Sequence, residues 1–231
     1  MKKYMLIIFG LIFIYLVLQT VFSGYYLRRA GILTNTEYTQ DVKLGNKDKP
    51  TLRVFMSGDS IAAGVGASSF ETSTPGRLTN FLAKENNLIF VNEAESGTRM
   101  ADLLDFPALN EKQDLIILVV SSNDLFHFTN LGDFKRSTEE VMEKYSKLGK
   151  KLVVIGPGRV STAPALPLPL RLIYKIIRPN YVAIIAEAVS KHSNIVYVKP
   201  TPPEKDTFAS DKFHPNDEGH IIWFEGIKDA I

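Results

Sequence analysis

The sequence predicts a doubly wound α/β domain that follows a membrane-spanning helix. The first observation behind this prediction is an uncharged apolar run near the amino terminus, Tyr4 to Phe22. The second is a series of short, β-branched strand-like runs that alternate with helical stretches. The third is that polar residues follow several of these runs, at the sheet edge where doubly wound domains bind ligands.

The apolar run has the length of a bilayer span, since about 20 apolar residues cross the hydrocarbon core. A secretory signal has a shorter apolar region and a small-residue cleavage site. Residues 1–23 are therefore expected to be an uncleaved membrane anchor. Secretion after cleavage near residues 21–23 is the alternative.

Charges on either side of the run give opposite indications of its orientation. Lys2 and Lys3 favour an amino terminus inside the cell, whereas Arg28 and Arg29 lie just beyond the span and oppose it. We expect the bulk of the protein to lie outside the cytoplasmic membrane.

Residues 24–50 lack a sustained hydrophobic period and are expected to be a tether, which leaves residues 51–231 as the folded domain. Five strands are expected in that domain. Most are apolar on both faces, as in a parallel sheet that helices cover on both sides. The expected strands are Leu52–Met56, Leu88–Asn92, Asp114–Val120, Lys151–Ile155 and Ile195–Val198.

Helical stretches are expected between these strands and at the carboxyl end. They are Pro75–Asn87, Ala101–Asp105, Ser137–Leu148, Tyr181–Lys191 and a last helix from Asn216 to Ile231. Ser137 and Glu140 have the spacing of a capping box, which places the start of the third helix at Ser137.

The segment 159–179 departs from the alternating pattern because prolines interrupt a run of large apolar residues. Such a long connection in a compact domain is often functional. We expect either a connection packed against the domain, or a loop or short helix that lines an acyl-binding or membrane-facing cleft.

Composition excludes two kinds of site. The chain has no cysteine, so it has neither disulfides nor thiolate metal sites. It has 27 basic and 25 acidic residues, for a net charge of +2, with no long block of one sign. Nucleic-acid-binding proteins carry a clustered basic surface, so no nucleic-acid partner is expected.

Candidate chemical groups follow the first three expected strands. Ser60 follows the first, where the Gly58-Asp59-Ser60 turn is expected to lead to a helix amino terminus with free N–H groups. The backbone N–H of Gly97 and the side-chain amide of Asn123 follow the next two. Together with the Ser60 N–H, they could hold a developing oxyanion.

A serine nucleophile needs a base, and His214 is the expected one. Asp211 precedes it by three residues, so its carboxylate could reach one imidazole nitrogen while the other faces the hydroxyl. Asp124 and His127 repeat this spacing. They directly follow Asn123, where a base would crowd the oxyanion donor, so His127 is interpreted as structural.

Taken singly, each of these signals is common in turns and caps. A metal site formed by His214, His220, Asp211 and Asp217 is an alternative, although these residues lack a recognised zinc spacing. His192 stands alone near the expected end of a helix.

In combination, the motifs resemble those of the SGNH (GDSL-type) hydrolase family across about residues 52–231. The matching stretches are GDS at 58–60, SGT at 96–98, SSND at 121–124 and DKFHPN at 211–216. The resemblance implies a catalytic triad of Ser60, Asp211 and His214. It also implies an oxyanion hole formed by Ser60, Gly97 and Asn123.

Two residues depart from the family pattern. Ser121 stands where the family usually has glycine, and its side chain could narrow the site or tilt Asn123. Ile61 stands where leucine is commonest, which is a mild change behind the nucleophile.

The resemblance further implies a three-layer α/β/α sandwich with a five-stranded, parallel, flavodoxin-like sheet. It implies ester hydrolysis through an acyl-serine intermediate, with no metal or organic cofactor. The expected partners are a small-molecule, glycan or lipid ester as substrate and the membrane through the amino-terminal segment. An anchored member is expected to remove acyl or O-acetyl groups from envelope lipids or glycans.

Two other functions are alternatives. An acyltransferase shares the acyl-enzyme half of the reaction, so the sequence does not separate it from a hydrolase. A non-catalytic envelope binding protein would not need a complete triad, so the presence of Ser60, Asp211 and His214 together argues against it.

Overall fold

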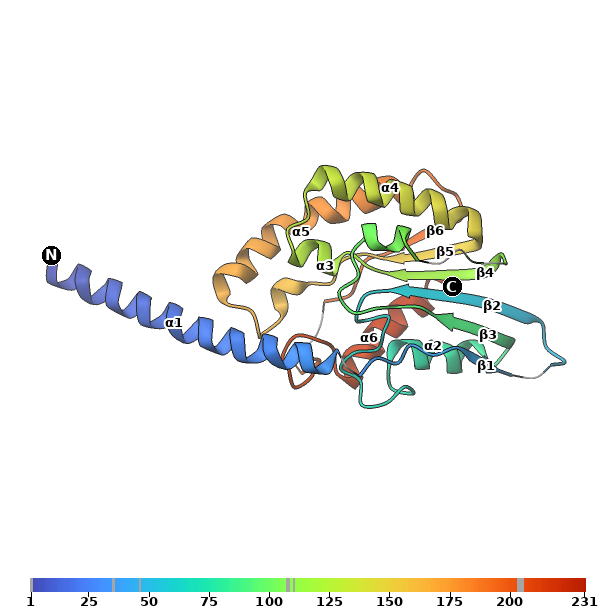
Figure 1. Ribbon diagram of the computed structural model, residues 1–231, viewed down its shortest axis with the longest axis horizontal. Coiled ribbons are helices and arrows are strands. Elements are labelled where there is room, and N and C mark those ends of the chain that lie inside the picture. Colours follow the sequence, from blue (N-terminus) through green and yellow to red (C-terminus); the bar gives the residue numbers. More distant parts are fainter. Residues whose placement is uncertain (1, 35, 46, 107–108, 110, 203–205) are drawn as a thin grey trace.

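The computed structural model of the protein describes residues 2–231 except 35, 46, 107–108, 110 and 203–205, and the described residues form a six-stranded sheet (Figure 1). The strand order is β1-β3-β2-β4-β5-β6. The strands are β1 (Val42–Leu44), β2 (Thr51–Gly58), β3 (Asn87–Asn92), β4 (Gln113–Val119), β5 (Gly149–Ile155) and β6 (Ile195–Val198). All neighbours pair in parallel except β1, which is antiparallel to β3.

The five expected strands and their flavodoxin-like order are confirmed. From β2 the chain winds outward to β3 and then crosses to the other side of β2 to form β4. The winding direction therefore switches between β2 and β4. In sheets of this kind the ligand site lies at the carboxyl ends of the strands beside the switch.

The expectation of a tether over residues 24–50 is wrong. Helix α1 (Lys2–Leu33) continues well past residue 23, and β1 then adds an edge strand to the sheet. The backbone N–H of Tyr38 donates to the carbonyl of Ala63 at 2.7 Å, so this part of the chain packs on the domain. Three residues are too few for β1 to show an alternating pattern in the sequence.

Helices cover both faces of the sheet, which gives the expected three layers (Figure 1). One face carries α3 (Ser122–Phe126), α4 (Leu131–Leu148) and α5 (Leu168–Val189), and the other carries α2 (Thr74–Leu82) and α6 (Asp217–Lys228). Two short 3-10 helices among the described residues are η1 (Ala101–Leu104) and η2 (Val160–Thr162).

Alternate residues of the central strands supply the two cores. Phe55 of β2 packs with Tyr145 of α4 on one face, whereas Met56 packs with Leu78 of α2 on the other. Successive side chains of a strand point to opposite faces. Both faces are buried here, so the central parts of these strands are mostly apolar.

The predicted capping box is wrong. Helix α4 begins at Leu131 because Asn130 caps it, with the side-chain oxygen accepting from the N–H of Gly132 at 2.8 Å. Ser137 lies in the helix interior and is buried.

Helix α5 begins at Leu168 rather than Tyr181, so half of the segment 159–179 is helical. Pro167 is the N-cap residue and Pro169 lies in the first turn, where a missing N–H costs nothing. Pro179 lies inside the helix but on its exposed side, where water can replace the lost backbone hydrogen bond.

Candidate active site

The end of β2 approaches β4 too closely for any side chain except that of glycine. Gly58 has a φ of +140°, and a Cβ atom there would lie 1.9 Å from the carbonyl oxygen of Val119. The N–H of Asp59 donates to the same carbonyl at 2.8 Å. This contact fixes Ser60 just beyond the sheet, beside the switch point.

Ser60 does not open a helix, contrary to expectation. Residues 59–66 form consecutive turns, in which the N–H of Ala63 donates to the carbonyl of Asp59 at 3.0 Å, and α2 starts only at Thr74. Two glycines of this stretch have positive φ, which ends the helical path. Neither the N–H nor the hydroxyl of Ser60 has a partner among the described residues, so both are available to a ligand.

His214 and Asp211 form a buried pair, with 2.6 Å between Nδ1 and Oδ2. The other carboxylate oxygen accepts from the N–H groups of Phe213 and His214 at 2.9 and 3.0 Å. Burial acts to raise the pKa of Asp211, but the His214 hydrogen bond and these N–H groups outweigh burial and hold the pKa below its ordinary value. The ionised carboxylate therefore orients the ring, leaving Nε2 for another partner.

Ser60, Asn123 and His214 line one cavity of about 90 Å³. Ser60 and His214 make no hydrogen bond to each other in the described structure. In unliganded sites such a contact often tightens only with substrate. The rest of the cavity wall is mostly apolar, and includes Ile61, Val160, Ala163, Phe208, Phe213, Ile222 and Trp223.

Gly97 does not line that cavity but an open hollow with Glu95 and Thr98. This turn is nevertheless tied to the site, because Asn123 Nδ2 donates to the carbonyl of Thr98 at 3.1 Å. The N–H of Glu95 donates to the carbonyl of Gly58 at 3.0 Å. Gly97 itself has a φ of +92°, and its N–H has no partner among the residues described.

Asp124 and His127 do not form a second acid–base pair. The Asp124 carboxylate is buried and accepts from the N–H of Met100 at 2.8 Å, and burial raises its pKa despite this contact. His127 is exposed, packs edge-on against Phe126 and lies outside the cavity. Asp124 of α3 thus holds the segment that follows the Gly97 turn through the N–H of Met100. The position of His127 outside the cavity fits its interpretation as a structural residue.

The two departures from the family pattern have different consequences. Ser121 is buried with a φ of +80°, in the left-handed region that glycine occupies most easily, and its hydroxyl donates to the carbonyl of Val120. It does not line the cavity, so of the two possible effects of its side chain the structure does not show the narrowing of the site. Ile61 does line the cavity, directly behind Ser60.

Asp59 is a second buried carboxyl in the cavity wall. One oxygen accepts from the N–H of Ile61 at 3.0 Å, and the other has no hydrogen bond in the described structure. Burial raises the pKa of Asp59 to about 7, although the Ile61 N–H, the His214 ring and the Ser122 hydroxyl act to lower it.

The alternative metal site is not assembled. The His220 ring contacts the Thr74 hydroxyl at 2.8 Å and the Val65 carbonyl at 3.1 Å, and Asp217 accepts from the Ser68 hydroxyl at 2.6 Å. Both side chains tie α6 to α2 and its preceding loop. Within the described part of the chain, no three His, Asp or Glu side chains are grouped as metal ligands.

Sequence reasoning missed most of the apolar wall. Gly219, Ile222 and Trp223 share one face of α6, and their i, i+3, i+4 spacing is the signal that could have found them. Val160 and Ala163 belong to the segment 159–179, for which cleft lining was one of the two expectations.

Comparisons with known proteins identify the family and the fold. The model of the GDSL-like lipase/acylhydrolase family matches residues 56–222, whereas a comparison with curated proteins gives no match. Axe2, an acetylxylan esterase from Geobacillus stearothermophilus, is 17% identical, with a TM-score of 0.59 over 81% of this chain and 95% of its own. An extracellular lipase from Streptomyces rimosus is also 17% identical, with a TM-score of 0.60 over 78% of this chain and 100% of its own.

A third similar structure is LAE5, an alpha/beta hydrolase from the metagenome of Lake Arreo, Spain. It is 14% identical, with a TM-score of 0.60 over 79% of this chain and 95% of its own. The structural likenesses show a shared fold, and the family model covers more than half of the sequence. The chain belongs to the GDSL-like lipase/acylhydrolase family and is an SGNH-type serine hydrolase.

Proposed function

We propose that the protein is a membrane-anchored esterase that acts outside the cytoplasmic membrane and hydrolyses carboxylic esters through an acyl-serine intermediate. Its substrates are acyl or O-acetyl esters of envelope lipids or glycans. The observation that carries this proposal is the buried His214–Asp211 pair, 2.6 Å apart, at the cavity that Ser60 also lines.

In the first half of the reaction, the Ser60 hydroxyl attacks the ester carbonyl while His214 Nε2 takes its proton. The ionised Asp211 stabilises the imidazolium that forms. His214 then gives the proton to the leaving alcohol, and the acyl group stays on Ser60. In the second half, water attacks the acyl-enzyme with His214 again as the base, and the carboxylic acid leaves.

The developing oxyanion would be held by the N–H groups of Ser60 and Gly97 and by the side chain of Asn123. Support comes from the two N–H groups, which have no hydrogen-bond partner among the residues that the structure describes. The Asn123 amide has two N–H donors, of which the Thr98 carbonyl takes one. Each donor typically contributes about 3 kcal/mol to transition-state stabilisation.

The cavity wall supports an acyl group as its occupant. Phe208, Phe213, Ile222 and Trp223 offer apolar surface, which favours a hydrocarbon over the hydroxyl groups of a sugar. The catalytic mutants of Axe2 replace a serine, an aspartate and a histidine, the last two three residues apart. Asp211 and His214 have the same spacing.

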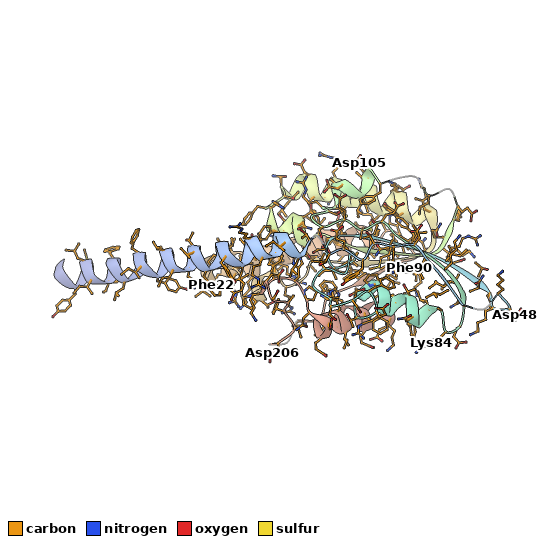
Figure 2. The ribbon with its side chains drawn as sticks, turned by 60° about the horizontal axis from the view of Figure 1, so that its bottom comes forward. Phe22, Asp48, Lys84, Phe90, Asp105 and Asp206 are labelled. Carbon is orange, nitrogen blue, oxygen red and sulfur yellow. The ribbon has the colours of Figure 1, made fainter. Side chains whose placement is uncertain are left out.

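The anchor assignment is supported by the length and composition of α1. Its stretch Tyr4–Leu33 is long and apolar enough to cross a bilayer, and its most apolar window is not buried in the protein. Figure 2 shows the side chains of this helix free of the domain over most of its length. A signal sequence passes the same test, so secretion after cleavage remains the alternative.

A fluorophosphonate probe tests the nucleophile. The detergent-solubilised full chain is expected to take one phosphonyl group on Ser60, located by mass spectrometry, while Ser60→Ala takes none. Because the Ser60 hydroxyl makes no hydrogen bond to any described residue, this variant should melt at nearly the same temperature as the wild type.

The same assay tests the base. His214→Gln should lose probe labelling and hydrolysis of a soluble ester. His127→Gln is the matched control, and its labelling and hydrolysis should stay close to those of the wild type. Equal losses in the two histidine variants would contradict the assignment of His214. A folded wild type that takes no label would favour a non-catalytic binding protein.

A further inference from the structure

One exposed face of α5 changes from apolar to polar along its length. Residues three or four apart share a helix face. Along this face lie Leu168, Leu172, Ile176, Asn180, Ala183 and Glu187. Leu168, Leu172 and Ile176 are 50%, 51% and 74% exposed, with Ile173 exposed beside them, whereas Glu187 pairs with Lys135 at 2.9 Å. A surface helix normally presents polar residues to water throughout, so the first half of α5 is exceptional.

A strained residue extends this apolar surface. Phe128 has a φ of +55°, a conformation that bulky side chains rarely adopt, and its ring is half exposed. The ring stacks on Tyr174 of α5 with 5.3 Å between centroids. We define the α5 patch as Phe128, Leu168, Leu172, Ile173 and Ile176.

Aromatic rings connect the α5 patch to the active-site cavity. Tyr174 also stacks on Phe126 at 6.0 Å, and Phe126 meets Phe213 edge-on at 5.7 Å. Phe213 lines the cavity next to His214. An unbroken path of apolar contacts therefore runs from the protein surface to the site of the reaction.

The α5 patch lies where α1 leaves the domain. Ser23 and Ala30 of α1 are buried and seven residues apart, so one helix face packs against the domain there. Figure 1 shows the amino-terminal end of α5 on the side of the domain from which α1 extends, and Figure 2 labels Phe22 where α1 reaches the domain. The apolar run Tyr4 to Phe22 ends just before Ser23, and the first charged residue that follows is Arg28.

The residues that follow on α1 are typical of a membrane–water interface. Tyr25 and Tyr26 come first, and then Arg28 and Arg29, with an Arg29 N–H donating to the Tyr25 hydroxyl at 3.1 Å. Aromatic and basic residues are enriched at that depth. Lys175 is exposed between Ile173 and Ile176, and its long chain can reach the same headgroup layer.

We infer that the α5 patch inserts into the surface of the same bilayer that α1 crosses. The protein then contacts the membrane at two places, and the cavity wall at Phe213 lies close to lipid. This arrangement selects esters that are carried at the membrane surface. The inference rests on the proposed anchoring by α1, and the experiment below separates the two.

The absence of cysteine makes site-specific labelling direct. Leu172→Cys and Ile176→Cys place an environment-sensitive fluorophore in the α5 patch of the full chain. Ala183→Cys is the matched control at an exposed position farther along the same helix, and Val17→Cys reports on α1. Each labelled protein is reconstituted in phosphatidylcholine–phosphatidylglycerol vesicles with plain or brominated acyl chains, and circular dichroism verifies its fold.

We expect the brominated lipid to reduce fluorescence at both patch positions and at the α1 position, but not at Ala183→Cys. A loss of fluorescence at the α1 position with no loss at either patch position would overturn the inference. A second copy of the chain that covers the patch would give this result. Loss of fluorescence at the patch positions alone would show that the patch meets lipid but would contradict the anchor, and with it the insertion of both elements into one bilayer. No loss at any position would contradict both.

Discussion

At the scale of single residues, two buried carboxyls near the same imidazole have pKa values that are shifted in opposite directions. Asp211 receives a hydrogen bond from His214 and two from backbone N–H groups, which keep it ionised. Among the described residues, the N–H of Ile61 is the one donor at hydrogen-bond distance from Asp59. Burial outweighs this N–H, the His214 ring and the Ser122 hydroxyl, and the pKa of Asp59 rises to about 7. Hydrogen bonds to the ionised carboxylate lower its pKa, and the larger number at Asp211 accounts for the opposite shifts of the two pKa values.

Asp59→Asn is expected to change the pH dependence of stability. The folded-state pKa of about 7 lies above the ordinary value of 3.8, so Asp59 stabilises the fold fully below about pH 4 and this contribution is lost as the pH rises through 7. The variant does not titrate. Its free energy of unfolding relative to wild type should therefore increase over this range, on the order of a few kcal/mol.

Urea denaturation of the solubilised protein, followed by the fluorescence of the single tryptophan, Trp223, measures this difference at each pH. Comparing the two proteins cancels the titration of the other carboxyls. A difference that stays constant from acidic to neutral pH would contradict the raised pKa.

At the scale of elements, caps rather than hydrophobic period set where α4 begins. Asn130 supplies the oxygen that accepts from the N–H groups of Gly132 and Asp133. Ser137 has the sequence spacing of a cap but lies within the helix, where its side chain is buried. An N-cap residue acts only directly before the first helical residue, where its own backbone is not helical.

Asn130→Ala should lower the free energy of unfolding by about 1 kcal/mol because the first turn of α4 loses its acceptor. Ser137→Ala is the matched control, and it should not destabilise, since alanine favours the helix interior. Urea denaturation followed by circular dichroism measures both. If Ser137→Ala destabilised the protein more than Asn130→Ala, the result would favour the helix start at Ser137 that the sequence predicted.

At the scale of the whole molecule, few residues separate the end of α1 from the first backbone hydrogen bond to the domain. The helix runs to Leu33, and Tyr38 is already bonded to the turn that follows Ser60. This geometry places the domain directly at the end of the apolar stretch. A long tether would instead leave the domain free to rotate away from the membrane.

Deletion of residues 2–22 should release the protein from the lipid phase and leave an active esterase. Without its apolar run α1 cannot span the bilayer. The full chain should stay in the membrane fraction after an alkaline carbonate wash, whereas the shortened chain should appear in the supernatant. A shortened chain that resists carbonate would contradict the role of α1 as the anchor.

The sequence by itself determined the five parallel strands and the identity of Ser60, Asn123, Asp211 and His214 as candidates. Strand runs, tight turns and the three-residue step between aspartate and histidine are local, so neighbouring residues encode them. Tertiary structure alone decided the short strand β1, the start of α5, the place of Gly97 outside the main cavity and the apolar wall around Trp223. Each depends on contacts between residues far apart in the chain, which no local pattern contains.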